Sequence, residues 1–97
     1  MANKRITKVC ISKKAIQARI TKWCIKQAKK INADCLIAFE DLDKRRFYFK
    51  YDGFIYECLY YSGQLYNTSI DSFDKLFINS GWSYDYEDAS VMIIFKD

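Results

Sequence analysis

RFYFKYDGFIYECLYY, residues 46–61, carries the strongest local folding signal of the chain. Two runs rich in aromatic residues flank Asp52-Gly53, a dipeptide typical of the two-residue turn of a β-hairpin. A type I′ turn there sets three cross-strand pairs on one face: Tyr51 with Phe54, Phe49 with Tyr56, and Phe47 with Cys58. That face is almost wholly aromatic, so the stretch predicts a hairpin that another element must cover.

An amphipathic helix over residues 13–31 is the expected cover. Ser12 is a suitable N-cap, and Asn32-Ala33-Asp34 is expected to end the helix. Apolar residues recur at helical spacing along one side: Ile16, Ile20, Trp23, Cys24 and Ile31.

The remaining elements complete an α+β domain. We expect a buried strand at 35–39, with a helix continuing to Leu42 as the competing interpretation, and a charged turn at 40–45. A short strand at 64–67, a second helix at 70–79 and an interior apolar strand at 91–95 follow, whereas residues 81–88 give no strong signal. The sequence predicts one domain, residues 1–97, in which an antiparallel sheet of about four strands carries two helices on one face. The expected order is helix, strand, hairpin, short strand, helix, strand.

The composition fits a compact domain and excludes several classes of protein. No run approaches the roughly 18 apolar residues of a membrane span, and the first residues lack the apolar region of a secretory signal. We therefore expect a cytoplasmic protein with no membrane contact. The four cysteines form no CxxC pair and the chain has no histidine, so we expect reduced thiols, no metal and no cofactor.

Charge is divided unevenly along the chain. Residues 1–50 hold 14 Lys and Arg against 4 Asp and Glu, whereas residues 51–97 hold 2 against 8. Either the two halves neutralise each other in the fold, or one of them faces a charged partner.

The residues needed for catalysis are missing. The three glycines are isolated at positions 53, 63 and 81, so they form no phosphate-binding loop. Without histidine, acid–base chemistry would need paired carboxylates in an apolar setting, and the acids lie in expected loops and helix ends. We predict a binding protein and not an enzyme, with no catalytic residues.

The first candidate surface is a basic N-terminal arm and helix. Residues 1–33 hold ten basic residues and no acid. Five of the cations fall on one flank of the expected helix: Arg19, Lys22, Lys26, Lys29 and Lys30. They form either a solvated face or a contact for phosphates or an acidic protein surface, with Tyr48 and Tyr61 as stacking platforms or ordinary sheet surface. Ile25, opposite the core stripe, fits a contact between copies of the chain.

The second candidate surface is acidic and aromatic. Its residues are Asp71, Asp74, Trp82, Tyr84, Asp85, Tyr86, Glu87 and Asp88. Carboxylates on a rigid support can substitute for phosphates in a nucleic-acid-binding groove, and Trp and Tyr can anchor a protein partner. The alternative is a polar loop whose aromatic side chains cover the edge of the core.

The segment 77–88, FINSGWSYDYED, resembles the C-terminal part of a small anti-CRISPR family that inhibits the type II-A RNA-guided nuclease. In that family a helix leads to Gly-Trp, three residues and Tyr-Glu-Asp. The resemblance implies that Asp85, Glu87 and Asp88 take the place of acidic groups that block a DNA-entry site. The family is acidic throughout, whereas this chain is basic over its first half.

These observations predict a stoichiometric inhibitor or regulator of a nucleic-acid enzyme of host defence. A proline-free composition rich in Asn, Lys, Ile and Tyr is associated with AT-rich genomes, which fits a phage or mobile-element product acting in the host cytoplasm. Two alternatives stay open. The basic helix could bind nucleic acid directly, or its cations and the sheet tyrosines could hold an anionic nucleotide signal between subunits.

Overall fold

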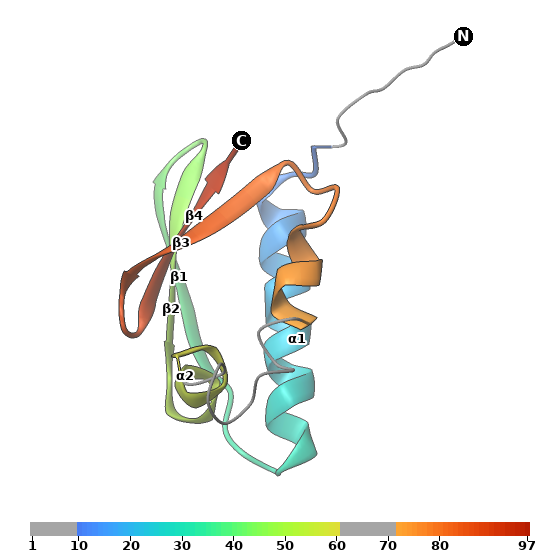
Figure 1. Ribbon diagram of the computed structural model, residues 1–97, viewed down its shortest axis with the longest axis vertical. Coiled ribbons are helices and arrows are strands. Elements are labelled where there is room, and N and C mark those ends of the chain that lie inside the picture. Colours follow the sequence, from blue (N-terminus) through green and yellow to red (C-terminus); the bar gives the residue numbers. More distant parts are fainter. Residues whose placement is uncertain (1–9, 61–71) are drawn as a thin grey trace, which may run out of the picture.

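The helix expected near the N-terminus is the first element of the computed structural model, which describes residues 10–60 and 72–97 (Figure 1). It is α1 (Lys13–Lys30), and the Ser12 hydroxyl caps it by accepting the Ala15 N–H at 3.1 Å. The predicted stripe is buried except at Ile31, which lies past the last helical residue and is exposed. Asn32, with φ 55°, turns the chain away from the helix as expected.

Four strands form one antiparallel sheet, so the predicted α+β class is confirmed. They are β1 (Leu36–Asp43), β2 (Arg46–Asp52), β3 (Trp82–Asp88) and β4 (Val91–Lys96). The strand order is β1-β2-β4-β3, which leaves β1 and β3 at the two edges. β4 is interior to the sheet, as its apolar sequence predicted.

The predicted hairpin at Asp52-Gly53 is wrong. β2 ends at Asp52, and Gly53, with φ +60°, starts a helix, α2 (Gly53–Tyr60). Buried α2 residues are spaced i, i+3, i+4 at Ile55, Cys58 and Leu59, a pattern that suits a helix packed on a core. β2 instead pairs with β1 and β4, and its aromatic face is buried as predicted.

The predicted turn at 40–45 is also wrong, as is the alternative helix to Leu42. β1 continues through its acidic half to Asp43, and the turn is confined to Lys44 and Arg45. Cations from α1 and β2 pair with the acidic side chains, which makes the extended conformation acceptable there.

Residues 82–88 are strand β3 and not a loop. Trp82, Tyr84 and Tyr86 alternate with polar residues and lie opposite β4 residues, Tyr84 across from Ile94. The short strand predicted at 64–67 lies outside the described residues.

The helices lie on the aromatic face of the sheet, and in the described residues no helix covers the other face (Figure 1). The second predicted helix, 70–79, ends earlier than expected: residues 72–74 are helical and continue as a 3-10 turn, η1 (Lys75–Phe77). Phe73 is fully buried there and contacts the rings of Trp23, Phe49 and Tyr84. No helix among residues 10–60 and 72–97 is long and apolar enough to cross a membrane.

Candidate functional site

The acidic-aromatic segment occupies an edge of the sheet. Among residues 10–60 and 72–97, β3 pairs only with β4, and a register irregularity lies between Tyr86 and Asp88. The start of the strand is fixed to the residues before α1, because Ile11 donates its N–H to the Ser80 carbonyl at 2.9 Å. Gly81 closes this junction: it has φ +79°, and a Cβ there would lie 2.8 Å from the Cys10 sulfur.

Trp82 is not a partner anchor, contrary to the sequence-based interpretation. It is only 2% exposed, and its indole N–H donates to the Ile11 carbonyl at 2.8 Å. Because the backbone alternation points Trp82 toward the helices, the side chain fills the core. The alternative interpretation, in which the aromatics of this segment cover the core, is correct for Trp82.

The two tyrosines of β3 are partly buried, and both are hydrogen-bonded inside the molecule. The Tyr84 hydroxyl donates to the Asp74 carboxylate, and the Tyr86 hydroxyl donates to the Leu59 carbonyl at 2.9 Å. Burial raises the pKa of Tyr84 and of Tyr86, and Asp74 adds to both shifts. Tyr86 is 46% exposed, so its ring can still contribute contact area.

Three carboxylates of β3 stay available to a partner. Asp85, Glu87 and Asp88 are exposed, and within residues 10–60 and 72–97 none of them forms an ion pair. The Asp85 carboxylate accepts the Tyr86 N–H at 2.9 Å, which orients it on the strand. Asp71, the remaining acid of the predicted set, lies outside the described residues.

A shallow cleft adjoins the start of β3 on the side of η1. It has a volume of about 350 Å³, with Phe77 and Trp82 among its apolar walls and Asp74 and Asp97 among its polar ones. The structure therefore brings Asp74 close to β3, as the sequence predicted, but places it at the opposite end of the strand from Glu87 and Asp88.

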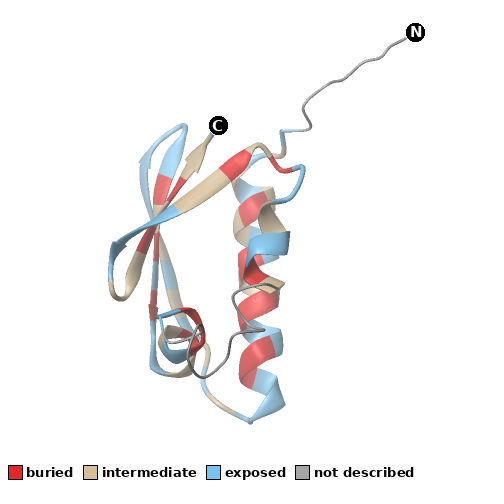
Figure 2. Ribbon diagram, viewed as in Figure 1, coloured by how far each residue is buried: buried red, intermediate tan, exposed pale blue. Residues whose placement is uncertain are grey.

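The cations of α1 form a separate surface. Lys22, Lys26 and Lys29 are exposed, and no described ion pair includes them. Figure 2 shows exposed and buried stretches alternating along α1, as expected of a helix with one face on the core. Arg19 donates to the Leu76 carbonyl at 3.0 Å, and Lys30 donates to the Gln27 side chain at 3.3 Å. Arg19 thus holds η1 to α1 and is less available than the three lysines.

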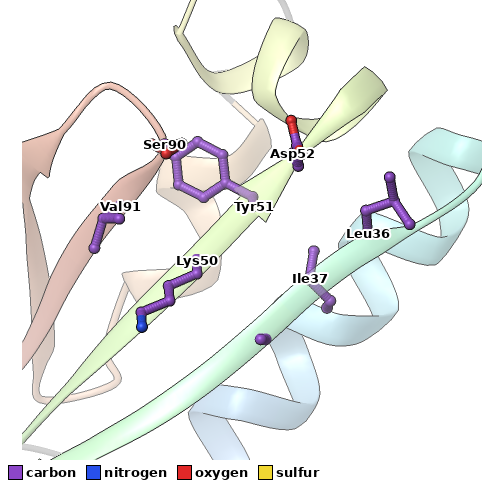
Figure 3. A pocket seen from close by; sticks show the side chains of 8 residues that line it. Leu36, Ile37, Lys50, Tyr51, Asp52, Ser90 and Val91 are labelled. Carbon is purple, nitrogen blue, oxygen red and sulfur yellow. The ribbon is translucent and has the colours of Figure 1, made fainter.

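Sequence reasoning missed a hollow on the uncovered face of the sheet. A cleft of about 450 Å³ lies there between residues of three strands (Figure 3), where Leu36, Lys50 and Val91 form part of its wall. The missing signal was the pairing of β2 with β4, because a hairpin at Asp52-Gly53 would have placed other residues beside Lys50.

The described residues offer little for metal or thiol chemistry. No group of three or more His, Cys, Asp or Glu side chains among them is placed to hold a metal ion. The thiols of Cys24 and Cys58 are buried. Burial raises the pKa of the Cys24 thiol, which disfavours the reactive thiolate.

Comparisons with protein-family models, curated proteins and solved structures gave no significant match. The resemblance of residues 77–88 to anti-CRISPR inhibitors therefore stays a hypothesis.

Proposed function

We propose that this protein is a small stoichiometric inhibitor whose β3 edge occupies a basic, nucleic-acid-binding groove on a protein partner. The observation that carries the proposal is the set of exposed carboxylates on β3, Asp85, Glu87 and Asp88, which lack an ion pair within the described residues. A carboxylate loses favourable hydration when it is buried against a partner, and a cationic groove offsets that loss.

The support under β3 fits this function. The strand is hydrogen-bonded to β4 along its length, and Trp82 and Tyr84 fix it to the core. A rigid support keeps the carboxylates at a constant spacing and lowers the entropy lost on binding. The partner class is a nucleic-acid-processing enzyme of host defence, which follows from the resemblance to anti-CRISPR proteins.

The test uses a type II-A RNA-guided nuclease loaded with guide RNA. We expect the full chain to co-elute with the complex and to reduce cleavage of a target DNA as its molar ratio to the nuclease approaches one. The triple variant Asp85→Asn, Glu87→Gln, Asp88→Asn should inhibit at least about tenfold less well, since it lacks the charges that pair with the groove.

The control variant is Glu57→Gln, which removes an exposed carboxylate from α2 and leaves those of β3 in place. It should inhibit as well as the unaltered protein. Cleavage that persists at a large excess of the protein would contradict the proposed partner class, and inhibition by the triple variant equal to that of the control would contradict the role of β3.

Direct binding of nucleic acid by α1 is a second candidate function. It is favoured by the exposure of Lys22, Lys26 and Lys29 on a helix without acidic residues. Bare single-stranded DNA should then bind with an affinity that falls steeply with salt, and Lys22→Gln with Lys26→Gln should lower the slope of log K against log salt by about 2. An affinity that does not change between low and physiological salt would exclude this function.

The alternative in which the cations of α1 hold an anionic nucleotide signal gains no support from the two clefts. The larger lies on the uncovered sheet face and the smaller beside β3, and neither is lined by the lysines of α1.

A further inference from the structure

The outer edge of β1 is the second open edge of the sheet. β1 is eight residues long and pairs with β2 alone, and no other described segment pairs with it. A strand of this length presents about 26 Å of backbone, along which alternate N–H and C=O groups point outward. Such an edge is a template for another extended chain.

The acidic side chains of β1 do not protect this edge against pairing with another strand, because cations of the same chain neutralise them. Glu40 pairs with Lys50, Asp41 with Lys13 at 3.4 Å, and Asp43 with Arg46 at 2.9 Å. Lys13, the first residue of α1, also donates to the Asp43 carbonyl at 2.6 Å. The N-terminal end of α1 therefore holds the acidic half of the strand. Every carboxylate of β1 therefore has a cation from its own chain, and the strand carries no net charge to repel a copy of itself.

Apolar residues are exposed along the same edge. Leu36 is 49% exposed and Leu42 is 37% exposed, one at the start of β1 and the other near its end. Between them the exposed Ala38 has a side chain small enough for a neighbouring strand to approach closely.

We propose that β1 binds β1 of a second copy of this chain, in antiparallel orientation about a twofold axis, to form a continuous eight-stranded sheet. Centring the twofold axis on Ala38 places residues 36–40 of each strand beside residues 36–40 of the other, and the carboxylate among them, that of Glu40, is already paired with Lys50. β3 is excluded from the same role because its carboxylates would face like charges.

The contact is small, which sets the expected affinity. Five residues on each side, 36–40, compare with about 20–30 in an interface of standard size, so the dimer should form and dissociate with concentration. The proposal is independent of the inhibitory function, because β3 lies at the opposite edge of the sheet.

The experiment is analytical ultracentrifugation of the full chain from about 10 µM to about 1 mM, a range in which weak interfaces are populated. A reducing agent is present so that the exposed Cys10 cannot cross-link two copies. We expect the weight-average mass to rise with concentration toward that of a dimer. Ala38→Lys, which places a cation on the edge, should weaken dimer formation at least about tenfold.

Ala18→Lys is the matched control, since Ala18 is an exposed alanine on the outer face of α1. This variant should change the dissociation constant of the dimer by less than about twofold. If Ala38→Lys does not fold by circular dichroism, Leu42→Lys adds the same charge at another exposed position of β1.

Amide hydrogen exchange locates the contact. Outward-pointing β1 amides should gain protection as concentration rises, while those of β3 do not. Three results would overturn the proposal: a monomer at about 1 mM, equal weakening by Ala18→Lys, or β1 protection that is already complete in the dilute monomer.

Discussion

The two edge strands of the sheet carry the same number of acidic side chains, three each, and these side chains have opposite surroundings. On β1, Glu40, Asp41 and Asp43 all pair with cations of the same chain. On β3, Asp85, Glu87 and Asp88 have no such partner in the described part of the chain. The difference teaches that acid content alone does not define an acidic surface. The position of nearby Lys and Arg decides which edge repels a copy of itself and which attracts a cationic partner.

Phe49→Ala should have the largest effect, because it removes the support that the two edges share. Phe49 is fully buried, contacts Phe39 of β1 with ring centroids 5.6 Å apart, and stacks on Phe73, which contacts Tyr84 of β3. We expect the free energy of unfolding in urea to fall by about 3–5 kcal/mol. Tyr48→Ala, on the uncovered face of the same strand, is the control and should lower the free energy of unfolding by less. A loss below about 1 kcal/mol for Phe49→Ala would show that the edges do not depend on this residue.

Lys50→Gln should make β1 resemble β3. The substitution leaves Glu40 without its cation, so the strand regains a repulsive charge. We expect the proposed self-association to weaken about three- to tenfold in sedimentation experiments, while the unfolding free energy changes by less than about 1 kcal/mol, as is usual for an exposed pair. Lys44→Gln, in the turn between β1 and β2, is the control. Equal effects of the two variants would mean that neutrality of β1 does not govern the contact.

The reverse change should make β3 resemble β1. The triple variant removes the charges that keep two copies apart at this edge; its substitutions are Asp85→Asn, Glu87→Gln and Asp88→Asn. We expect self-association at low salt to rise about two- to threefold above that of the unaltered protein, a smaller effect because β3 is one residue shorter than β1. Sedimentation velocity measures it against Glu57→Gln. No increase would show that charge is not what keeps β3 from pairing.

Alkaline pH should weaken the packing of β3 and not that of β1, because of the two edge strands only β3 contains tyrosines. Burial is the first cause that raises the pKa of Tyr84 and Tyr86, and it also raises that of Tyr51 on β2. The neutral phenols stabilise the fold in full below the unfolded pKa of about 10, and this contribution is lost as the pH rises toward the folded value.

We therefore expect the melting temperature to fall above about pH 10, and to fall less steeply in Tyr84→Phe than in the control Tyr48→Phe. Just above pH 10 this is the smallest of the four effects, since each tyrosine of the unfolded chain is then only partly ionised. Circular dichroism melts measure it, and equal slopes for the two variants would contradict it.

Local patterns predicted the elements whose own residues carry a clear cap, stripe or apolar run. The Ser12 cap and the stripe from Ile16 to Cys24 located α1, and the apolar run from Val91 located an interior strand. Asp52-Gly53 misled because a glycine with positive φ serves a turn or the start of a helix equally well. The choice depended on β4, which lies far along the sequence and takes the place beside β2.

The candidate site was predictable in composition and not in geometry. The sequence located the acids of residues 85–88, but it could not show that Trp82 turns inward, since that depends on its alternation against β4. It also could not separate the paired acids of β1 from the unpaired acids of β3. Lys13 and Asp41 are 28 positions apart in the sequence, so no local pattern could predict that they form an ion pair.

The two tryptophans of the chain lie under different surfaces, and this gives each surface its own spectroscopic reporter. The Trp23 indole donates to the Ser72 hydroxyl at 2.8 Å, between α1 and the helical residues 72–74, whereas the Trp82 indole donates to the Ile11 carbonyl at the start of β3. A single nitrogen-15 spectrum of indole-labelled protein would show two resonances. Whichever one moves when a ligand is added identifies the occupied side of the molecule, without any mutation.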